Sequence, residues 1–242
     1  MTQPTEPIEF AVAADEITER FTAGSTLSPA VLEDLHKICT TSAEAQSLAE
    51  HGRDWWPLAM HWALNGKTPR KPGAVSTPKT TEQVAALVAA CNKHDLPLTV
   101  AGGRSGVCGS AVPLYGGVVL DVTAMQGIVS VDQVSGIVEV LPGTFGPDFE
   151  NELQSKYSLT VGHFPQSFDI STVGGWVACR GAGQYSTRYG KIEDMVVGLE
   201  VVLANGDVVR TGGAPASAIG PDLTSLFVGS EGTLGVITKV WL

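Results

Sequence analysis

Positively charged residues are scarce in this 242-residue sequence. Lysine and arginine number 15 against 25 aspartates and glutamates, so the formal net charge is −10, and charged residues make up only 17% of the chain. Nucleic-acid binding depends on a face rich in lysine and arginine, and so does adhesion to an anionic membrane surface. The composition therefore excludes both kinds of partner from our expectations.

Long apolar runs are also missing, since no stretch approaches the roughly 18–20 residues that a membrane span needs. Residues 1–16 carry acids and lack the basic and apolar regions of a signal peptide. The four cysteines (Cys39, Cys91, Cys108 and Cys179) have neither zinc-site spacing nor a C-x-x-C pair, and the five histidines are scattered. We therefore expect a cytoplasmic protein with no transmembrane segment, no metal, and four reduced thiols that are mostly buried.

Three common site motifs are each broken at one position. Ser186 stands where the G-x-G-x-x-G dinucleotide fingerprint that begins at Gly181 needs its last glycine. His61 stands where a P-loop needs its first glycine, and Val107 where a nucleophile elbow needs its last. The broken motifs therefore exclude the usual Rossmann dinucleotide site, the P-loop and the hydrolase nucleophile elbow.

Glycine is abundant, with 28 residues, and three clusters of it follow or separate apolar segments. The clusters are Val100–Gly106, Gln166–Trp176 and Gly229–Gly235. Each offers unhindered backbone N–H groups beside hydroxyls, which suits a phosphate or pyrophosphate. Any one cluster alone could be an ordinary turn. Three in one chain favour a diphosphate ligand, which the residues by themselves do not name.

Helical and strand patterns alternate along the chain and predict a mixed α+β fold. One helix is expected after Ser28, a second after Thr41-Ser42, and a third at the Thr80 to Gln83 capping box. Strands are expected over residues 98–101, 117–121, 128–132, 136–141, 196–203 and 235–242, with a hairpin turn at Asn205-Gly206.

Composition shifts near Pro69 divide the chain into an N-terminal helical extension, residues 1–68, and a main domain, residues 69–242. The extension includes the tryptophan-rich segment His51 to Leu64, for which core packing is the default and a partner surface the alternative. The chain ends on the apolar run Val236–Leu242. Either this strand is tied into a sheet, or a second domain should follow it.

Five motifs occur in order along the main domain. They are Pro78-x-Thr80-Thr81-Glu82-Gln83-Val84, Gly102-Gly103-Arg104-Ser105, Ser171-Thr172-Val173-Gly174-Gly175, Tyr189-Gly190, and Glu231-Gly232-Thr233-Leu234-Gly235-Val236-Ile237-Thr238. The ordered set resembles the flavin-binding domain of the vanillyl-alcohol-oxidase superfamily of FAD-linked oxidases, which is of the p-cresol-methylhydroxylase (PCMH) type. The resemblance covers residues 69–242 and implies two α/β subdomains, about 69–141 and 142–242, with FAD held by both.

The resemblance implies a cofactor-binding role for residues of all three glycine clusters, the first as a pyrophosphate clamp and the others along the flavin and ribityl portions. These residues are Val100, Ala101, Gly102, Gly103, Arg104, Ser105, Gly106, Gln166, Ser167, Asp169, Ser171, Thr172, Gly174, Gly175, Cys179, Arg180, Ala182, Glu231, Gly232, Thr233, Leu234, Gly235, Val236 and Ile237. Relatives with histidine-linked FAD carry that histidine where this chain has Arg104, so the resemblance implies non-covalent FAD. The Arg104 side chain could assist the pyrophosphate or be a solvated loop residue.

Two sub-branches of the family share features with this chain. Gly198–Leu203 followed by Asn205-Gly206 resembles D-lactate and glycolate dehydrogenases. The segment Gly162–Ser167 and the segment Tyr189–Asp194 are closer to alkyldihydroxyacetonephosphate synthase, which uses FAD to exchange an acyl for an alkyl chain.

The resemblance implies an FAD-dependent oxidoreductase that oxidises a hydroxy acid or related alcohol by hydride transfer to flavin N5. The alternatives are the synthase-like transferase and a flavin-binding fragment or subunit without turnover. We expect a missing cap domain or partner chain, an unidentified electron acceptor, possible homo-oligomers, and no turnover by this chain alone. No catalytic residue is assigned, because His163, whose ordinary pKa suits a base, is more often a locally hydrogen-bonded loop residue.

Overall fold

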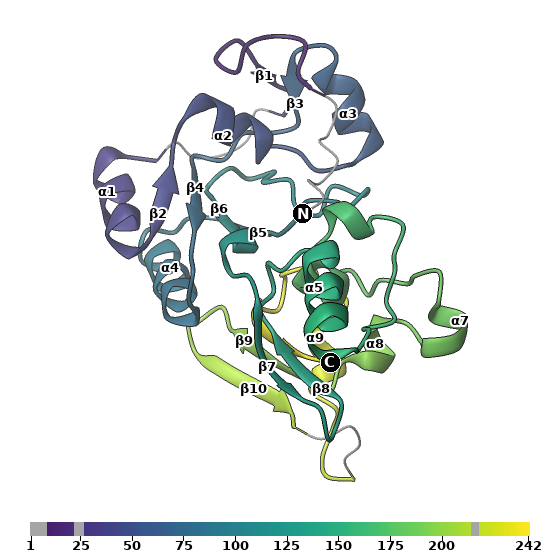
Figure 1. Ribbon diagram of the computed structural model, residues 1–242. Coiled ribbons are helices and arrows are strands. Elements are labelled where there is room, and N and C mark those ends of the chain that lie inside the picture. The colour runs from purple at the N-terminus through teal and green to yellow at the C-terminus, as the bar shows by residue number, and fades with distance from the viewer. Residues whose placement is uncertain (1–8, 22–26, 214–217) are drawn as a thin grey trace. The chain divides into compact units, whose positions relative to one another are not determined.

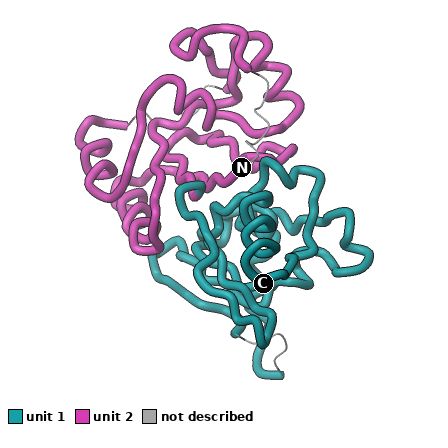
Figure 2. Tube along the Cα trace, in the orientation of Figure 1, with its two compact units in different colours: residues 1–4, 123–242 teal, residues 5–122 magenta. Residues whose placement is uncertain are grey.

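The computed structural model describes residues 9–21, 27–213 and 218–242. The chain divides into two compact units, which Figure 2 shows in two colours. We call residues 5–122 the N-terminal unit and residues 123–242 the C-terminal unit. Each has its own sheet and its own apolar core, so each is described by itself.

The N-terminal unit is built on a four-stranded sheet with the order β2-β4-β6-β5. β4 (Ala74–Thr77), β6 (Val118–Asp121) and β5 (Leu98–Ala101) are parallel, and β2 (Thr40–Ser42) is antiparallel to β4. A separate parallel pair joins β1 (Thr18–Glu19) to β3 (Lys67–Thr68). The parallel pairing brings the carboxyl ends of β4, β5 and β6 to one edge of the sheet.

Four helices accompany this sheet: α1 (Pro29–Ile38), α2 (Ala45–Glu50), α3 (Pro57–Ala63) and α4 (Thr81–Lys93) (Figure 1). The expected caps are confirmed, because Ser28 Oγ accepts from the N–H of Val31 and Thr80 Oγ1 accepts from the N–H of Gln83. The apolar stripe of α4 is fully buried, as its helical spacing predicts.

The C-terminal unit has a five-stranded antiparallel sheet with the order β10-β9-β11-β8-β7. Its strands are β7 (Ile128–Asp132), β8 (Ile137–Val140), β9 (Gly198–Val202), β10 (Val208–Gly212) and β11 (Val236–Trp241). The final strand is thus paired on both sides, and the Asn205-Gly206 hairpin joins β9 to β10 as expected.

Helical segments between these strands are short. They are α5 (Gly146–Glu152), the π-helix η2 (Leu153–Tyr157), α6 (Val173–Ala178), α7 (Ser186–Tyr189), α8 (Ile192–Met195), α9 (Thr224–Phe227), and the 3₁₀ turns η1 (Val122–Ala124) and η3 (Phe168–Ile170). Phe149 of α5 and Val177 of α6 pack with Val140, Leu199 and Val240 of the sheet in one buried cluster. Packing in this buried apolar cluster holds α6 in place, and the first residues of α6 belong to the second glycine cluster.

The observed division differs from the expected one in two places. The units separate between Val122 and Thr123 rather than near residue 141, because β8 pairs with β11 in the C-terminal sheet and β7 pairs with β8. Residues 1–68 do not stand apart as an extension, since β2 pairs with β4. Trp56 and Trp62 are half-buried and pack edge to face on each other, with ring centroids 5.3 Å apart.

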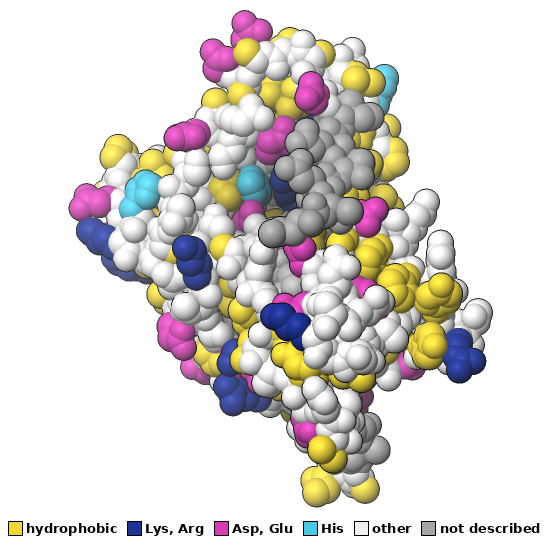
Figure 3. All heavy atoms as spheres, in the orientation of Figure 1, with side chains coloured by type: hydrophobic (Ala, Val, Ile, Leu, Met, Phe, Trp, Pro, Cys, Tyr) yellow, Lys and Arg dark blue, Asp and Glu magenta, His cyan; other side chains and the backbone are white. Residues whose placement is uncertain are grey.

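The thiols are less buried than expected. Cys39 and Cys91 are buried, but Cys108 and Cys179 are exposed, and no disulfide joins any of these four described residues. No helix among residues 9–21, 27–213 and 218–242 is long and apolar enough to cross a membrane. On the face that Figure 3 draws, lysine and arginine side chains are scattered among acidic ones rather than gathered into a basic surface.

The core of the C-terminal sheet gives a direct test of this fold. Leu199 on β9 is fully buried, so we expect Leu199→Ala to lower the free energy of unfolding by about 3 kcal/mol, the usual cost of a cavity at such a site. The matched control is Val208→Ala on the edge strand β10, where the side chain is 48% exposed and the expected change is below about 0.5 kcal/mol. Urea unfolding followed by circular dichroism measures both; equal changes would contradict the placement of β9.

Candidate functional site

The first glycine cluster leaves the carboxyl end of β5, beside the end of β6. Ala101 is paired with Asp121 at this edge, and Gly102 to Gly106 follow directly as a half-buried loop, the first glycine loop. Open α/β sheets bind their ligands at the carboxyl ends of parallel strands. The position of this loop therefore fits a ligand-binding role.

The backbone N–H groups of Gly103, Arg104, Ser105 and Gly106 donate no hydrogen bond to any residue that the structure describes. Four consecutive unpaired donors in a half-buried loop are unusual, because buried N–H groups are normally satisfied. Arg104 adopts the left-handed conformation with φ 53°, which breaks the extended run after β5. Such an arrangement can take an anionic ligand with several acceptor oxygens.

The Arg104 side chain is half-buried and makes a hydrogen bond within the N-terminal unit. Its Nη1 donates to the carbonyl oxygen of Glu50 at the end of α2, where the helix dipole favours a cation. Burial lowers the pKa of Arg104 from its ordinary value, and the nearby Asp121 and Glu50 act in the opposite direction. The Arg104 side chain therefore ties the loop to α2 through this hydrogen bond.

A histidine that the sequence analysis did not single out reaches the same sheet edge. His51 Nδ1 lies 2.9 Å from the carbonyl oxygen of Ser47, and Nε2 lies 3.0 Å from Asp121 Oδ2. Each ring nitrogen of His51 therefore lies within hydrogen-bond distance of an oxygen, one on α2 and one on β6. This contact fixes the end of β6 against α2.

The second glycine cluster forms the start of α6, and its N–H groups are already used within the C-terminal unit. Val173 N donates to Thr144 O at 2.9 Å, and Gly174 N to Pro142 O at 2.8 Å. Thr172 Oγ1 accepts from the third N–H, of Gly175, at 3.3 Å. These N–H groups are therefore not available to a phosphate, contrary to the general expectation for such clusters.

Gly174 is required by the protein rather than by a ligand. A Cβ at this position would lie 2.6 Å from Pro142 Cβ and 2.9 Å from Pro142 O. Any larger residue at position 174 would clash with Pro142, in the turn before α5, and would displace α6. A substitution here therefore acts on the packing of the C-terminal unit.

The third glycine cluster is hydrogen-bonded to the end of α6. Gly229 N donates to Val177 O at 3.0 Å, and Glu231 N to Ala178 O at 3.1 Å. Arg180 Nη2 donates to Val228 O at 3.2 Å, and both Arg180 and Glu231 have left-handed φ angles, 54° and 47°. The second and third clusters thus form one continuous surface within the C-terminal unit.

The expected site residues of this unit fall into an exposed and a buried group. Gln166, Asp169, Cys179, Arg180, Ala182, Glu231, Thr233 and Leu234 are exposed, whereas Ser171, Thr172, Gly174, Val236 and Ile237 are buried. Ser167, Gly175, Gly232 and Gly235 are intermediate. The buried members support the surface: Ser171 Oγ, for example, accepts from Trp176 Nε1 at 2.6 Å.

His163 is not the locally hydrogen-bonded loop residue that was the more common expectation. Only 1% of its surface is exposed, and neither ring nitrogen has a hydrogen-bond partner among the described residues. Its ring packs edge to face on Trp176, with centroids 5.0 Å apart. Burial lowers its pKa from 6.5 to about 4, so the ring is neutral near pH 7.

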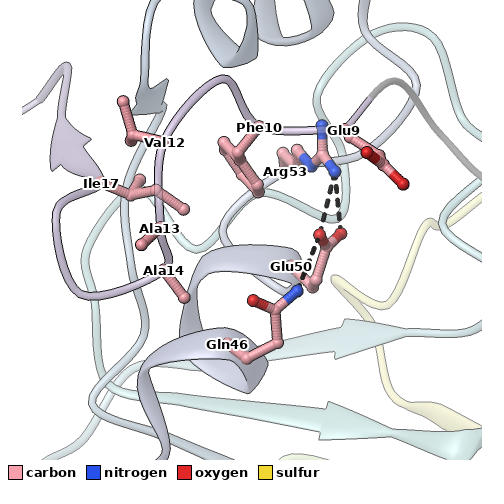
Figure 4. Close-up of a pocket in the computed structure, with 9 residues that line it drawn as sticks. All are labelled: Glu9, Phe10, Val12, Ala13, Ala14, Ile17, Gln46, Glu50 and Arg53. Carbon is pink, nitrogen blue, oxygen red and sulfur yellow. Dashed lines mark hydrogen bonds and ion pairs between the residues drawn. The ribbon is translucent and has the colours of Figure 1, made fainter.

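A cavity of about 440 Å³ lies in the N-terminal unit beneath the segment Glu9–Ile17 (Figure 4). Its walls are mainly apolar side chains of that segment, together with Gln46, Glu50 and Arg53. Arg53 and Glu50 are engaged with each other there, as the dashed lines in Figure 4 mark. No group of three or more potential metal-ligating side chains occurs within the described ranges.

The family of the chain follows from comparison with known proteins. A family model described as "FAD binding domain" matches residues 72–212, which is more than half of the chain. The chain belongs to this FAD-binding family. FAD is accordingly the cofactor of the domain, and the unpaired N–H groups of the first glycine loop fit its pyrophosphate.

Two curated relatives indicate the kind of enzyme in which such domains occur. The glycolate oxidase subunit GlcD of Bacillus subtilis is 40% identical over 169 residues, which is 69% of this chain and 36% of that protein. A D-lactate dehydrogenase of Anaerostipes hadrus is 34% identical over 181 residues, or 74% of this chain and 37% of that protein. The chain thus spans about a third of the length of these relatives.

Solved structures confirm the expected architecture. An alkyldihydroxyacetonephosphate synthase superposes with a TM-score of 0.84 at 25% identity, covering 100% of this chain and 44% of that one. p-Cresol methylhydroxylase superposes with a TM-score of 0.75 at 27% identity, covering 91% of this chain and 44% of that one. The fold is therefore that of the PCMH-type FAD-binding domain, as the motif order predicted.

The neutral buried His163 makes stability depend on pH. Its pKa of about 4 in the folded protein lies below the ordinary 6.5 of the unfolded chain, so acidification protonates the unfolded state first. We expect up to about 3 kcal/mol of stability, present above pH 6.5, to be lost between pH 6.5 and pH 4.

Urea unfolding at pH 7 and pH 4.5 measures this loss. His163→Leu should lose less stability than the unsubstituted chain over this interval, because it has no imidazole to protonate. His61→Gln, at an exposed position, should behave like the unsubstituted chain. Identical pH dependence in all three proteins would contradict a buried neutral His163.

Proposed function

We propose that this domain is the flavin-binding part of an FAD-dependent oxidoreductase that oxidises a hydroxy acid or a related alcohol. The observation that carries the proposal is the first glycine loop, with four unpaired N–H groups at the carboxyl end of the parallel strands. Two of the relatives are named for glycolate and D-lactate, which supports a small 2-hydroxy acid as the substrate. Bound FAD supplies the hydride acceptor of such a reaction.

Each glycine cluster has a proposed share in holding FAD. Residues 100–106 hold the pyrophosphate, through the backbone N–H groups of residues 103–106, which donate to no residue that the structure describes. The surface formed by the second and third clusters holds the flavin and ribityl portions, chiefly through its exposed and half-exposed members around Arg180, Glu231 and Thr233. The buried members, such as Thr172 and Gly174, act by shaping that surface.

An alkyldihydroxyacetonephosphate-synthase-like transferase is the second candidate function. It is favoured by the superposition with that synthase, which extends over the whole chain. The two functions differ in a direct readout. A hydroxy acid reduces the flavin and bleaches its absorbance, whereas an acyl-for-alkyl exchange leaves the substrate with no net change of oxidation state.

The partners proposed for the whole protein are a small-molecule substrate, an electron acceptor of unassigned identity and a second copy of the chain. A domain or partner chain that completes the substrate site is also proposed, because the aligned residues make up only 36% and 37% of the matched relatives. A cytoplasmic location is supported by the four thiols, which lie in described parts of the chain and form no disulfide there.

Non-covalent FAD is the first prediction of this function. The position after Gly103 is Arg104, whose guanidinium is tied to Glu50 and has no nucleophilic atom for attachment at the flavin. Acid precipitation of the FAD-loaded protein should therefore leave all the flavin in the supernatant. Flavin fluorescence that stays with the pellet would contradict non-covalent binding, and a protein that cannot be loaded with FAD would contradict the function itself.

Turnover is the second prediction. We expect the FAD-loaded 242-residue chain to show no saturable oxidation of D-lactate, L-lactate or glycolate, because the proposed substrate contacts are shared with residues beyond the matched third of the relatives. The assay uses an artificial electron acceptor and free FAD as the background control. Saturable, stereoselective turnover would place the whole substrate site within these residues.

A further inference from the structure

The segment Glu50–Trp56 lies outside the residues that the family model matches, yet it contacts the first glycine loop in several places. Trp55 N donates to the carbonyl oxygen of Arg104 at 3.2 Å. The side chain of Arg104 returns to the carbonyl oxygen of Glu50. The segment Glu50–Trp56 therefore holds Arg104, the left-handed residue of the loop, through hydrogen bonds to its backbone and its side chain.

Asp54 lies at the centre of this segment and is almost fully buried, with 2% of its surface exposed. Its Oδ1 accepts from the N–H of Trp56 at 2.9 Å. Its Oδ2 faces the loop, since a Cβ on Gly106 would lie only 3.7 Å from it. No hydrogen bond to Oδ2 is formed by any residue of the described ranges, so a buried carboxylate oxygen stands directly behind the loop.

The far end of the loop rests on the same segment. A Cβ on Gly109 would meet the ring of Trp56 at 3.4 Å, so the chain passes close over the indole. Ala111 then enters the buried cluster of the sheet with Ala101 and Val119. Burial raises the pKa of Asp54 above its ordinary value, while the N–H groups of Trp56, Ala111 and Gly109 act against that rise. N–H groups from the segment and from the residues that follow the loop therefore act on one carboxylate.

The segment is itself rigidly held. Arg53 is 2% exposed, and its Nη2 donates to both carboxylate oxygens of Glu50 at 2.9 and 3.1 Å. Its guanidinium lies 3.9 Å from the ring centre of Phe10, on the wall of the cavity in Figure 4. The positive charges of Arg53 and Arg104 also offset the buried charge of Asp54.

We propose that the segment Glu50–Trp56 sets the shape of the first glycine loop, and that Asp54 is the positioning residue through which it does so. This inference rests on the proposed binding of the FAD pyrophosphate by the loop. A carboxylate suits the role because it only accepts hydrogen bonds, and the N–H groups of Trp56, Gly109 and Ala111, which act on it, are all donors. An asparagine would turn an NH₂ group toward those donors, and an alanine would leave them without an acceptor.

The test compares Asp54→Asn and Asp54→Ala with Val84→Ala, which removes buried volume from the N-terminal unit at α4, away from the loop. Fluorescence titration of the apoproteins gives the dissociation constants for FAD and for riboflavin, which lacks the pyrophosphate. The thermal midpoint of each apoprotein reports its folding. Should Asp54→Ala fail to fold, Asp54→Asn carries the test, because it keeps the volume and the acceptor for Trp56.

We expect both Asp54 variants to bind FAD roughly tenfold or more weakly, as loss of an organised anion site would produce. Riboflavin binding should be unchanged, because riboflavin has no group for the loop to hold. Val84→Ala should lower the thermal midpoint at least as much, with less than about a twofold change in FAD binding.

Asp54 variants that bind FAD as the unsubstituted chain does, or that lose FAD and riboflavin in equal proportion, would overturn the inference while leaving the proposed function intact. A loss of FAD binding by Val84→Ala as large as that of Asp54→Asn would also overturn it, because general destabilisation would then account for the effect. Failure of the unsubstituted chain to bind FAD would overturn the proposed function, and this inference with it.

Discussion

The parallel pairing of β5 with β6 underlies the candidate site of the N-terminal unit. It brings Ala101 and Asp121 to the same edge of the sheet, where the first glycine loop begins. The loop then leaves its own N–H groups unpaired within the described chain, so its shape has to come from contacts made by its carbonyl groups and side chains. α2 and the residues after it make those contacts, through the Glu50 carbonyl, the Trp55 N–H and the Asp54 carboxylate. These contacts thus hold the loop while leaving its N–H groups open to a ligand.

In the C-terminal unit, by contrast, the backbone N–H groups of a glycine cluster are used within the protein. Its second glycine cluster uses its N–H groups internally, and Gly174 is small because Pro142 packs against it. What remains for a ligand is the surface that α6 shares with the loop after α9, held together by hydrogen bonds from Gly229 and Glu231. Glycine has a different physical role in each unit: in the first it accompanies unpaired donors, and in the second it permits close packing.

Two ionisable side chains buried in the C-terminal unit differ in their charged neighbours. Glu200 on β9 is 3% exposed, and its charge is balanced by Arg210 and Lys239 on the neighbouring strands. His163 has no such partner in the described chain and is therefore neutral near pH 7. The two side chains differ because burial without a neighbouring opposite charge favours the neutral form of an ionisable group. Stability of the C-terminal unit should consequently be more sensitive to acid than its carboxylates alone would indicate.

Local elements and the family were predictable from the sequence alone. Helical caps at Ser28 and Thr80, the Asn205-Gly206 hairpin and the order of the glycine motifs are local signals, and the structure and the family match confirm what they predicted. The boundary between the units depended instead on the pairing of β8 with β11, across about a hundred residues, which carries β7 into the same sheet. The roles of Asp54, His51 and Gly174 likewise came from tertiary contacts, because no periodicity or motif records which backbone a side chain will meet once the chain has folded.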